Sequence, residues 1–379
     1  MRKKVKTDTK IRIIIDALCI RNHPTGLGNY SYYLIENLIK LGDYSFTILY
    51  QKDLTKSHRI NKLINDTVKF IPINIPIIGP KREYRFLTLS RVIDQYDLFH
   101  CLSSYLPAFG VQTPSIVTIH DLKYLLFPDF LSNFIKRKYY VWIIRKSIQK
   151  ATRIIVVSNT TKKDVIKQGG RNSKITVIHE AATLMEDKTQ NECHMPDEIS
   201  KKPYYLFVGE NRPHKNIDRI LDAYKILNFK LKEECPKFVF AGNGFSTFQQ
   251  QKNRAFFENL IFLGSVSDNL LISLYKHALA LVYPSLYEGF GLPILEAMSF
   301  GTPVITSNCS SMPEVAGNAA ILVRPNNVNE IEKALFKLAN DRNERERLKI
   351  LGLQRVKKFS WEKAARQTLE TYKQILSDR

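Results

Sequence analysis

The chain has 379 residues, of which 44% are hydrophobic and 25% charged, a balance that is typical of a soluble globular protein and excludes a disordered or low-complexity chain. Its net charge of +21 predicts an anionic partner, whether a nucleic acid, an anionic bilayer surface or a phosphate-bearing substrate. Residues 1–150 hold 24 Lys/Arg against 11 Asp/Glu, so the first part of the chain is the more basic one.

Short apolar runs rich in Val and Ile predict parallel β-strands that are covered on both faces. The first run follows a basic segment and so imitates a signal peptide. Asp16 interrupts it, however, and a buried strand is the better interpretation. In chain order the predicted strands are Ile11–Ile15, Ser45–Tyr50, Lys69–Ile73, Leu98–Cys101, Ser115–Ile119, Arg153–Val157, Lys174–Ile178, Tyr204–Val208, Lys237–Ala241, Leu260–Leu263, Ala280–Tyr283, Pro303–Thr306 and Ala320–Val323.

Amphipathic helical patterns alternate with these strands and complete βαβ units. They are predicted at Tyr30–Leu41, Thr160–Gln168, Asn216–Leu227, Asp268–Lys276, Pro293–Ser299, Val328–Asn340 and Trp361–Ser377. The alternation predicts an α/β protein with two doubly wound, Rossmann-like domains in tandem. We expect residues 1–185 to form the first domain, 186–202 a polar linker, 203–355 the second domain, and 356–379 a final helix that could lie against either domain.

A glycine pair, Gly26 and Gly28, lies between the first strand and the first helix. Glycines at such a place let the backbone approach an anion, and the following helix N-terminus offers free N–H groups. A tight turn without a ligand is the alternative interpretation. The complete dinucleotide-binding fingerprint is absent, since Ser31 occupies the position of its third glycine.

A second motif, YPSLYEGFGLPILE, places Glu288 in a glycine-rich loop and Glu296 on the helix that Pro293 helps to start. Two carboxylates at this spacing can face one cleft, and one of them can hold a ribose diol by paired hydrogen bonds. The alternative interpretation is a surface loop followed by a glutamate that the helix dipole stabilises. It accounts for either glutamate alone, but it accounts poorly for the whole motif.

The segment EGFGLPILE, together with IIIDALCIRNHPTGLGNYSYYLIENL and YLFVGENRPHKNIDRILDAY, resembles the retaining nucleotide-sugar glycosyltransferases of family 4. These segments occur in the family's order and spacing along essentially the whole chain. The resemblance implies the GT-B fold, in which two Rossmann-like domains face a cleft. Among family members, the chain most resembles bacterial mannosyl- and rhamnosyltransferases of polysaccharide assembly.

The resemblance also implies roles for residues that match the family's motifs. Glu296 matches the glutamate that binds the donor ribose, and Glu288 matches the one that contacts the hydroxyls of the donor sugar. Lys215 matches the cation that neutralises the diphosphate. The backbone of the donor site would then consist of Gly209, Gly289, Phe290, Gly291 and Leu292.

The first domain contributes further residues under the same resemblance. Gly26 and Gly28 would approach the diphosphate, and His120, in TIHDL, matches a histidine near the reacting sugar. A strand-end cap that satisfies loop amides is the alternative for His120. Family members favour a front-face displacement assisted by the leaving phosphate, so His120 would orient the substrate and not attack it.

One departure from the family pattern concerns charge. Relatives usually pair the lysine with an arginine, but the corresponding positions here are Glu210 and His214, and nearby Arg212 would have to provide the second cation. No DxD triplet occurs, so neither a metal ion nor another cofactor is expected beside the donor substrate, a GDP-, UDP- or dTDP-linked sugar.

Residues 81–86 and 134–146 mix cations with aromatic side chains. They suit an anionic membrane surface, which a lipid-linked acceptor would require, but an ordinary amphipathic helix with a solvated basic face is an equal alternative. No RNA-binding motif accompanies them, so nucleic acid is not an expected partner. The five scattered cysteines form no CxxC pair and favour a reducing, cytoplasmic location, with peripheral attachment to the inner face of the membrane as an extension.

The sequence therefore predicts a cytoplasmic enzyme that moves a hexose such as mannose or rhamnose from a nucleotide sugar to a saccharide or lipid-linked acceptor in cell-surface polysaccharide synthesis. Alternatives are a GT-B epimerase or phosphorylase, and a catalytically silent protein that binds a sugar nucleotide or nucleic acid. Glu210 and His214 keep the silent protein in consideration, whereas the intact pair of Glu288 and Glu296 argues against it.

Overall fold

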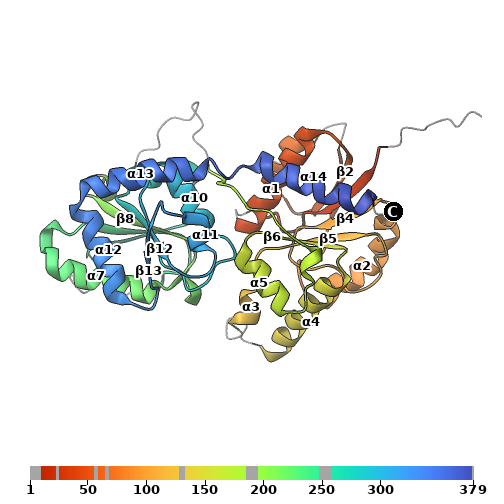
Figure 1. The fold of residues 1–379 in the computed structure, drawn as a ribbon, viewed down its shortest axis with the longest axis horizontal. Coiled ribbons are helices and arrows are strands. Elements are labelled where there is room, and N and C mark those ends of the chain that lie inside the picture. The colour runs from red at the N-terminus through yellow and green to blue at the C-terminus, as the bar shows by residue number, and fades with distance from the viewer. Residues whose placement is uncertain are drawn as a thin grey trace, which may run out of the picture. The chain divides into compact units, whose positions relative to one another are not determined.

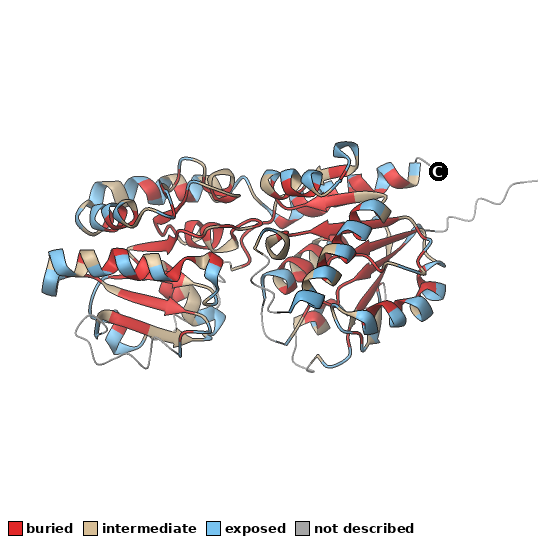
Figure 2. Cartoon of the chain, turned by 90° about the horizontal axis from the view of Figure 1, so that it is seen from below, coloured by how far each residue is buried: buried red, intermediate tan, exposed pale blue. Residues whose placement is uncertain are grey.

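The computed structural model describes residues 10–22, 25–54, 59–64, 68–127, 133–184, 195–246 and 258–377. The chain divides into two compact units, one made of residues 1–180 and 361–379 and the other of residues 181–360. Each unit contains one parallel sheet with helices on both faces, and the sheets hold the buried residues of each core (Figures 1 and 2). Two doubly wound domains, as the sequence predicts, are thus confirmed.

The first unit contains a seven-stranded sheet in the order β3-β2-β1-β4-β5-β6-β7, and all its strand pairs are parallel. The central strands β1 and β5 are built from β-branched residues and are buried almost throughout. The strands are β1 (Arg12–Asp16), β2 (Ser45–Gln51), β3 (Lys69–Ile73), β4 (Leu98–Cys101), β5 (Ser115–Ile119), β6 (Arg153–Val156) and β7 (Ile175–Val177).

The helices of the first unit include two long ones, α2 and α4, that the sequence patterns do not assign as helices. The buried face of α2 mixes Arg82 and Ser90 with Phe86, so its apolar period is weak, whereas the buried residues of α4, from Tyr140 to Ile148, recur at helical spacing. The helices are α1 (Gly26–Leu41), α2 (Pro80–Ile93), α3 (Lys123–Leu126), α4 (Phe134–Lys150), α5 (Asn159–Lys167) and the last helix of the chain, α14 (Trp361–Ser377), with 3-10 turns at Arg59–Leu63 and Asn172–Lys174.

The second unit has a six-stranded parallel sheet in the order β10-β9-β8-β11-β12-β13. Its strands are β8 (Tyr204–Val208), β9 (Lys237–Ala241), β10 (Leu260–Gly264), β11 (Ala280–Tyr283), β12 (Val304–Ser307) and β13 (Ile321–Val323). Its helices are α6 (Asp197–Ser200), α7 (Ile217–Leu231), α9 (Asp268–His277), α10 (Leu292–Ser299), α11 (Met312–Ala316), α12 (Val328–Asn340) and α13 (Arg342–Val356), with 3-10 turns at Pro213–Lys215 and Lys232–Glu234.

The structure places the C-terminal helix in the first unit. Helix α14 lies along α1 (Figure 1), and its first residue, Trp361, stacks on Tyr33 at a ring distance of 5.6 Å. At its other end Tyr372 hydrogen-bonds through its hydroxyl to Nδ1 of the buried His100, at 2.6 Å. The chain therefore crosses between the units twice, at residues 180–181 and at residues 360–361.

The unit boundaries differ from the ranges expected from the sequence. The second unit begins at Ala181, earlier than the expected 203, and includes Asp197–Ser200 as a short helix with a buried Ile199. Residues 186–194 of the expected linker lie outside the described residues. The expected final segment 356–379 is split, because α13 ends within the second unit and α14 begins the return to the first.

Candidate active site

The expected donor site lies at the carboxyl ends of β8 and β11, the two strands between which the order of the second sheet reverses. Ligands of open α/β sheets bind in the crevice outside such a switch point, because the connections that follow the two strands there run to opposite faces of the sheet. Residues 209–215 follow β8 and residues 284–291 follow β11. All the expected site residues of the second unit except Leu292 and Glu296, which lie on α10, belong to these two loops.

The loop after β8 begins with a close approach between two glycines. Gly209 donates from its N–H to the carbonyl of Ala241 at 2.9 Å, and a Cβ on Gly242 would lie only 1.9 Å from the carbonyl oxygen of Gly209. Both glycines have positive φ angles, 141° and 146°. Only glycine fits here, so the backbone fixes where the loop departs toward Lys215.

Lys215 and Glu288 form an ion pair that joins the two loops. The Nζ of Lys215 lies 2.8 Å from Oε1 of Glu288 and also hydrogen-bonds to the hydroxyl of Tyr283. Burial opposes ionisation of Glu288, yet Lys215, with a further contribution from His214, holds the pKa of this carboxyl below its usual value. The pair therefore keeps one cation and one carboxylate charged, with 15% and 13% of their side chains exposed.

Two serines in the loop after β12 hold the glycine-rich loop. The hydroxyl of Ser310 donates to the carbonyl of Glu288 at 2.7 Å and accepts from its N–H at 3.1 Å, and Ser311 donates to the carbonyl of Phe290 at 2.7 Å. Gly291 precedes α10 with a φ of 110°, which favours glycine, and Leu292 is the first helical residue. Gly289 and Phe290 are buried. Backbone and side-chain hydrogen bonds thus hold the loop around Glu288.

Glu296 is buried on α10, and both its carboxylate oxygens have a hydrogen-bond donor. Thr183 donates its hydroxyl to Oε1, and Tyr275 on α9 donates its hydroxyl to Oε2 at 3.1 Å. Burial raises the pKa of Glu296, although both hydrogen bonds oppose that rise. The structure thus holds one carboxylate ready to accept further hydrogen bonds through its remaining lone pairs.

Arg212 lies apart from the ion pair of Lys215 and Glu288. Its guanidinium binds the carboxylate of Glu210 at 2.9 Å, and both side chains are well exposed. His214, two residues on, is buried, and its carbonyl accepts from the N–H of Leu286 at 2.7 Å. Glu210, at one of the two positions where the family resemblance leads us to expect an arginine, therefore neutralises the nearby Arg212.

In the first unit, Gly26 and Gly28 lie inside the first turn of α1. The helix begins at Gly26, four residues earlier than expected, because Thr25 caps it and accepts from the N–H of Gly28 at 3.0 Å. A Cβ on Gly28 would lie 3.5 Å from the carbonyl oxygen of Cys19, in the segment that follows β1. The N-terminus of α1 thus lies beside the end of β1.

His120 directly follows β5 and is buried with Glu180. Its Nδ1 lies 3.1 Å from Oε1 of Glu180 and its Nε2 lies 3.2 Å from the carbonyl oxygen of Leu102, the residue after β4. The ring of Tyr30 meets the imidazole edge-on at 4.5 Å. Three contacts therefore fix the orientation of His120.

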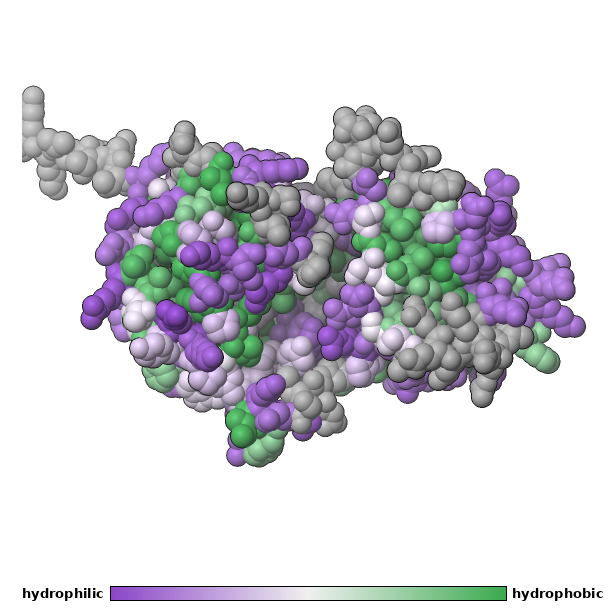
Figure 3. All heavy atoms as spheres, turned by 180° about the vertical axis from the view of Figure 1, so that it is seen from behind, coloured by the Kyte–Doolittle hydropathy of each residue, from purple (hydrophilic) through white to green (hydrophobic). Residues whose placement is uncertain are grey.

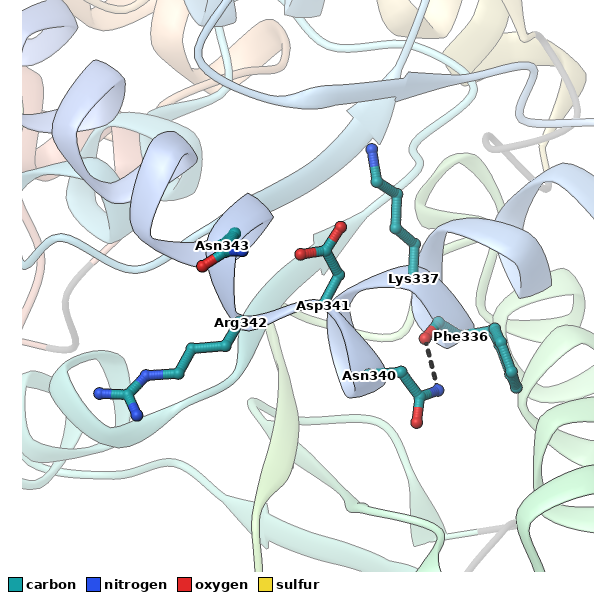
Figure 4. Close-up of a pocket in the computed structure, with 6 residues that line it drawn as sticks. All are labelled: Phe336, Lys337, Asn340, Asp341, Arg342 and Asn343. Carbon is teal, nitrogen blue, oxygen red and sulfur yellow. Dashed lines mark hydrogen bonds between the residues drawn. The ribbon is translucent and has the colours of Figure 1, made fainter.

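A hollow at the junction of α12 and α13 contains none of the expected site residues (Figure 4). Asn340 there donates its side-chain amide to the carbonyl of Phe336 at 2.9 Å, and Lys337 pairs with Glu344 at 3.0 Å. These contacts stabilise the helix junction. Its lining residues are Phe336, Lys337, Asn340, Asp341, Arg342 and Asn343.

Four polar residues of the site were missed by sequence reasoning: Glu180, Thr183, Tyr275 and Tyr283. Glu180 had a signal, since a lone carboxylate shortly after an apolar strand requires a partner if it is buried. The tyrosines had none, because a tyrosine in a strand or on a helix usually serves the core and its hydroxyl partner depends on tertiary contacts.

Two family models match this chain, and each covers most of one unit. Residues 24–183 match the model of Glycosyltransferase Family 4, and residues 191–354 match that of Glycosyl transferases group 1. The chain is 32% identical over 285 residues to O-antigen chain mannosyltransferase B of Escherichia coli, an alignment that covers 73% of this chain and 74% of the relative. The chain belongs to glycosyltransferase family 4. The family resemblance inferred from the sequence is thereby confirmed, and this family 4 protein is a glycosyltransferase.

Another relative, O-antigen chain mannosyltransferase RfbU of Salmonella typhimurium, is 32% identical over 58% of this chain and 59% of its own length. Among solved structures, sucrose-phosphate synthase from Thermosynechococcus elongatus superposes with a TM-score of 0.76 at 18% identity and covers 98% of this chain and 100% of that one. The Anabaena protein HepE in complex with UDP and glucose gives a TM-score of 0.70 at 16% identity, covering 96% and 99%. The GT-B fold of the family 4 protein is thus confirmed.

Proposed function

We propose that this glycosyltransferase transfers a hexose, mannose first among the candidates, from a nucleoside-diphosphate sugar to a saccharide or lipid-linked saccharide acceptor in the assembly of a cell-surface polysaccharide. The observation that carries the proposal is the similarity to the O-antigen chain mannosyltransferase B over 73% of the chain. The charged pair of Lys215 and Glu288 at the switch point of the second sheet supports it.

In this proposal the described residues of the second unit bind the donor. Glu296 accepts hydrogen bonds from the ribose hydroxyls, and Glu288 accepts hydrogen bonds from the hydroxyls of the sugar. Lys215 stabilises the negative charge that develops on the diphosphate as the sugar leaves, and Arg212 adds a second cation once it is released from Glu210. Gly209 begins the loop after β8, and residues 289–292 lead from the loop after β11 into α10, so their backbone groups are also placed to contact the donor.

The proposed reaction retains the configuration at the anomeric carbon. The bond from that carbon to the phosphate oxygen breaks while a new bond to the acceptor oxygen forms on the same face. The proton of the acceptor hydroxyl moves to the leaving phosphate oxygen, so the nucleoside diphosphate leaves with the bonding electron pair. His120, and Gly26 and Gly28 at the N-terminus of α1, orient the reacting groups from the first unit.

The basic helices of the first unit suit an enzyme that works at the cytoplasmic face of an anionic membrane. Every residue of α2 and α4 is described, and all their exposed charged side chains are cationic: the only acidic residue, Glu83, is buried. Exposed aromatic residues accompany them, since Phe109 lies 6.0 Å from Trp142 of α4 and Tyr84 of α2 is 70% exposed. Cations around exposed aromatic rings favour anionic lipid headgroups.

The surface of the molecule mixes hydrophilic side chains with smaller hydrophobic patches on the face that Figure 3 shows. None of the helices in the described part of the chain has both the length and the apolar character that crossing a bilayer requires. We therefore propose attachment to the membrane surface through α2 and α4. Sedimentation with phosphatidylglycerol-containing vesicles tests this: the double variant Arg145→Glu/Lys146→Glu should lose binding, while Lys163→Glu/Lys167→Glu on α5 should keep it.

The proposed reaction is tested with purified protein and a panel of GDP, UDP, dTDP and ADP in a thermal-shift assay. A nucleotide at a hundredfold excess over its dissociation constant should add about 2.7 kcal/mol to the free energy of unfolding. The nucleotide that stabilises the protein identifies the nucleotide part of the donor, and release of that nucleotide from its sugar conjugates in the presence of acceptor measures turnover. Binding without turnover would favour the catalytically silent alternative, and no binding at all would refute the proposal.

A further inference from the structure

Residues 178–184, through which the chain passes from the first unit to the second, contain two buried polar side chains. Strand β7 ends at Val177, and Ala181 and Ala182 are buried in the middle of the segment. Glu180 is 5% exposed and Thr183 is 3% exposed. Connecting segments normally run over the surface, so two buried polar groups here need partners that offset their desolvation.

Each of these side chains contacts a different residue of the candidate site. Glu180, the residue at which the chain first leaves the first unit, binds Nδ1 of His120 at 3.1 Å. Thr183, three residues later and inside the second unit, donates its hydroxyl to the carboxylate of Glu296. One short segment thus holds one candidate site residue in each unit.

We propose that residues 180–183 form a positioning element of the active site, in which Thr183 sets the carboxylate of Glu296 for the donor ribose and Glu180 sets the imidazole of His120. The inference rests on the proposed function and adds two positioning residues to it. Neither residue needs to touch the substrate. Each acts through the side chain that it holds.

The role of Thr183 follows from the chemistry of a buried carboxylate. Two internal hydrogen bonds favour the ionised form of a carboxylate and fix its orientation, so its remaining lone pairs point in defined directions. Tyr275 donates the other hydrogen bond to Glu296. Burial and the charge of Asp268 raise the pKa of Glu296, and burial and the charge of Glu296 in turn raise the pKa of Tyr283. Without Thr183, burial and Asp268 would both favour protonation.

The experiment compares nucleotide binding by the wild type, Thr183→Val and Thr183→Ser, using the nucleotide of the panel that stabilises the wild type. Valine keeps the shape and removes the hydroxyl, so binding should weaken about tenfold, the usual effect of losing a hydrogen bond to a charged group. Serine restores the hydroxyl and should restore most of the affinity. Thr371→Val on α14 is the matched control, since that buried threonine donates its hydroxyl only to a helix carbonyl, at 2.9 Å.

The pH dependence separates positioning from simple packing. Burial already raises the pKa of Glu296, and the hydrogen bond from Thr183 opposes this rise. Thr183→Val should therefore raise that pKa further, so its nucleotide affinity should begin to fall at a higher pH than that of the wild type as the solution is acidified. A defect in packing alone would lower the affinity equally at every pH.

The role of Glu180 is tested by Glu180→Gln in the transfer assay. We expect kcat to fall at least tenfold with the KM for the donor unchanged, together with a changed ¹⁵N resonance of the His120 side chain. If Thr183→Val binds the nucleotide like the wild type at all pH values, or Thr183→Ser is as weak as the valine variant, the inference is overturned while the proposed function stands. If the wild type binds none of the four nucleotides, both are overturned.

Discussion

The ion pair between Lys215 and Glu288 gives the sharpest test of the site, through the variant Lys215→Met. The substitution keeps most of the side-chain volume but leaves Glu288 without its nearest cation. Removing one partner of a buried ion pair costs about 3–5 kcal/mol, and the small exposure of the two side chains places this pair near about 3 kcal/mol. For a unit of this size that corresponds to a fall in Tm of roughly 6–12 °C.

The sign of the pH dependence follows from the pKa of Glu288. In the wild type this pKa is lowered, so the carboxylate stabilises the folded state at neutral pH, and that contribution is lost as the pH falls through the folded pKa. In Lys215→Met, burial acts with little compensation and raises the pKa. The charged carboxylate then destabilises the fold at neutral pH, and acid relieves the penalty. The difference in stability between the two proteins should therefore shrink as the pH falls.

The assay is urea unfolding of the full-length chain at a series of pH values from neutral to mildly acidic, with the difference between wild type and variant as the readout. Other acid-sensitive groups are common to both proteins and cancel in this difference. The double variant Lys215→Met/Glu288→Gln removes both charges and should recover most of the lost stability. A loss that is independent of pH, or a double variant as unstable as the single one, would refute the electrostatic reasoning.

Three further predictions concern the donor site and the first unit. Glu296→Ala should weaken nucleotide binding in calorimetry, whereas Glu288→Ala should mainly lower kcat; wild-type transfer rates in both variants would contradict the assignment. Glu210→Gln should release Arg212 and tighten nucleotide binding severalfold at low salt, an effect that added salt should suppress. Burial lowers the pKa of His100 to about 3, so thermal stability should fall as the pH drops below about 6.5, and His100→Gln should flatten that fall.

The sequence predicts the strands of this fold well and the helices less well. A strand such as Ser115–Ile119 is covered on both faces, so its continuous β-branched run is a direct consequence of where it lies. Helix α4 buries one face at helical spacing and carries cations on the other, so an ordinary amphipathic helix and a membrane-binding surface fit the same stretch of sequence equally well. The start of α1 was placed late because two glycines imitate a turn, whereas the cap from Thr25 starts the helix before them.

For the candidate site, the sequence motifs suggest candidate residues, but they do not predict which side chains those residues contact. Lys215 and Glu288 are 73 positions apart, and only the parallel arrangement of β8 beside β11 brings them together. Thr183 and Glu296 are 113 positions apart and belong to no common motif. Partners of this kind depend on tertiary contacts, and a single sequence carries little information about them.

The two cations of the site, Lys215 and Arg212, are each paired with a carboxylate, so other groups must also contribute to binding a diphosphate. Lys215 is neutralised by Glu288 and Arg212 by Glu210, so the four side chains together offer a bound diphosphate no net positive charge. Backbone N–H groups of the loops after β8 and β11, and the N-terminus of α10, which begins directly after Gly291, add positive potential beside these two pairs. A diphosphate that draws Lys215 away would leave Glu288 charged and partly buried, unless hydroxyl groups of the sugar then donate to it. The same carboxylate that pairs with Lys215 would thus favour a complete nucleotide sugar over the nucleotide alone.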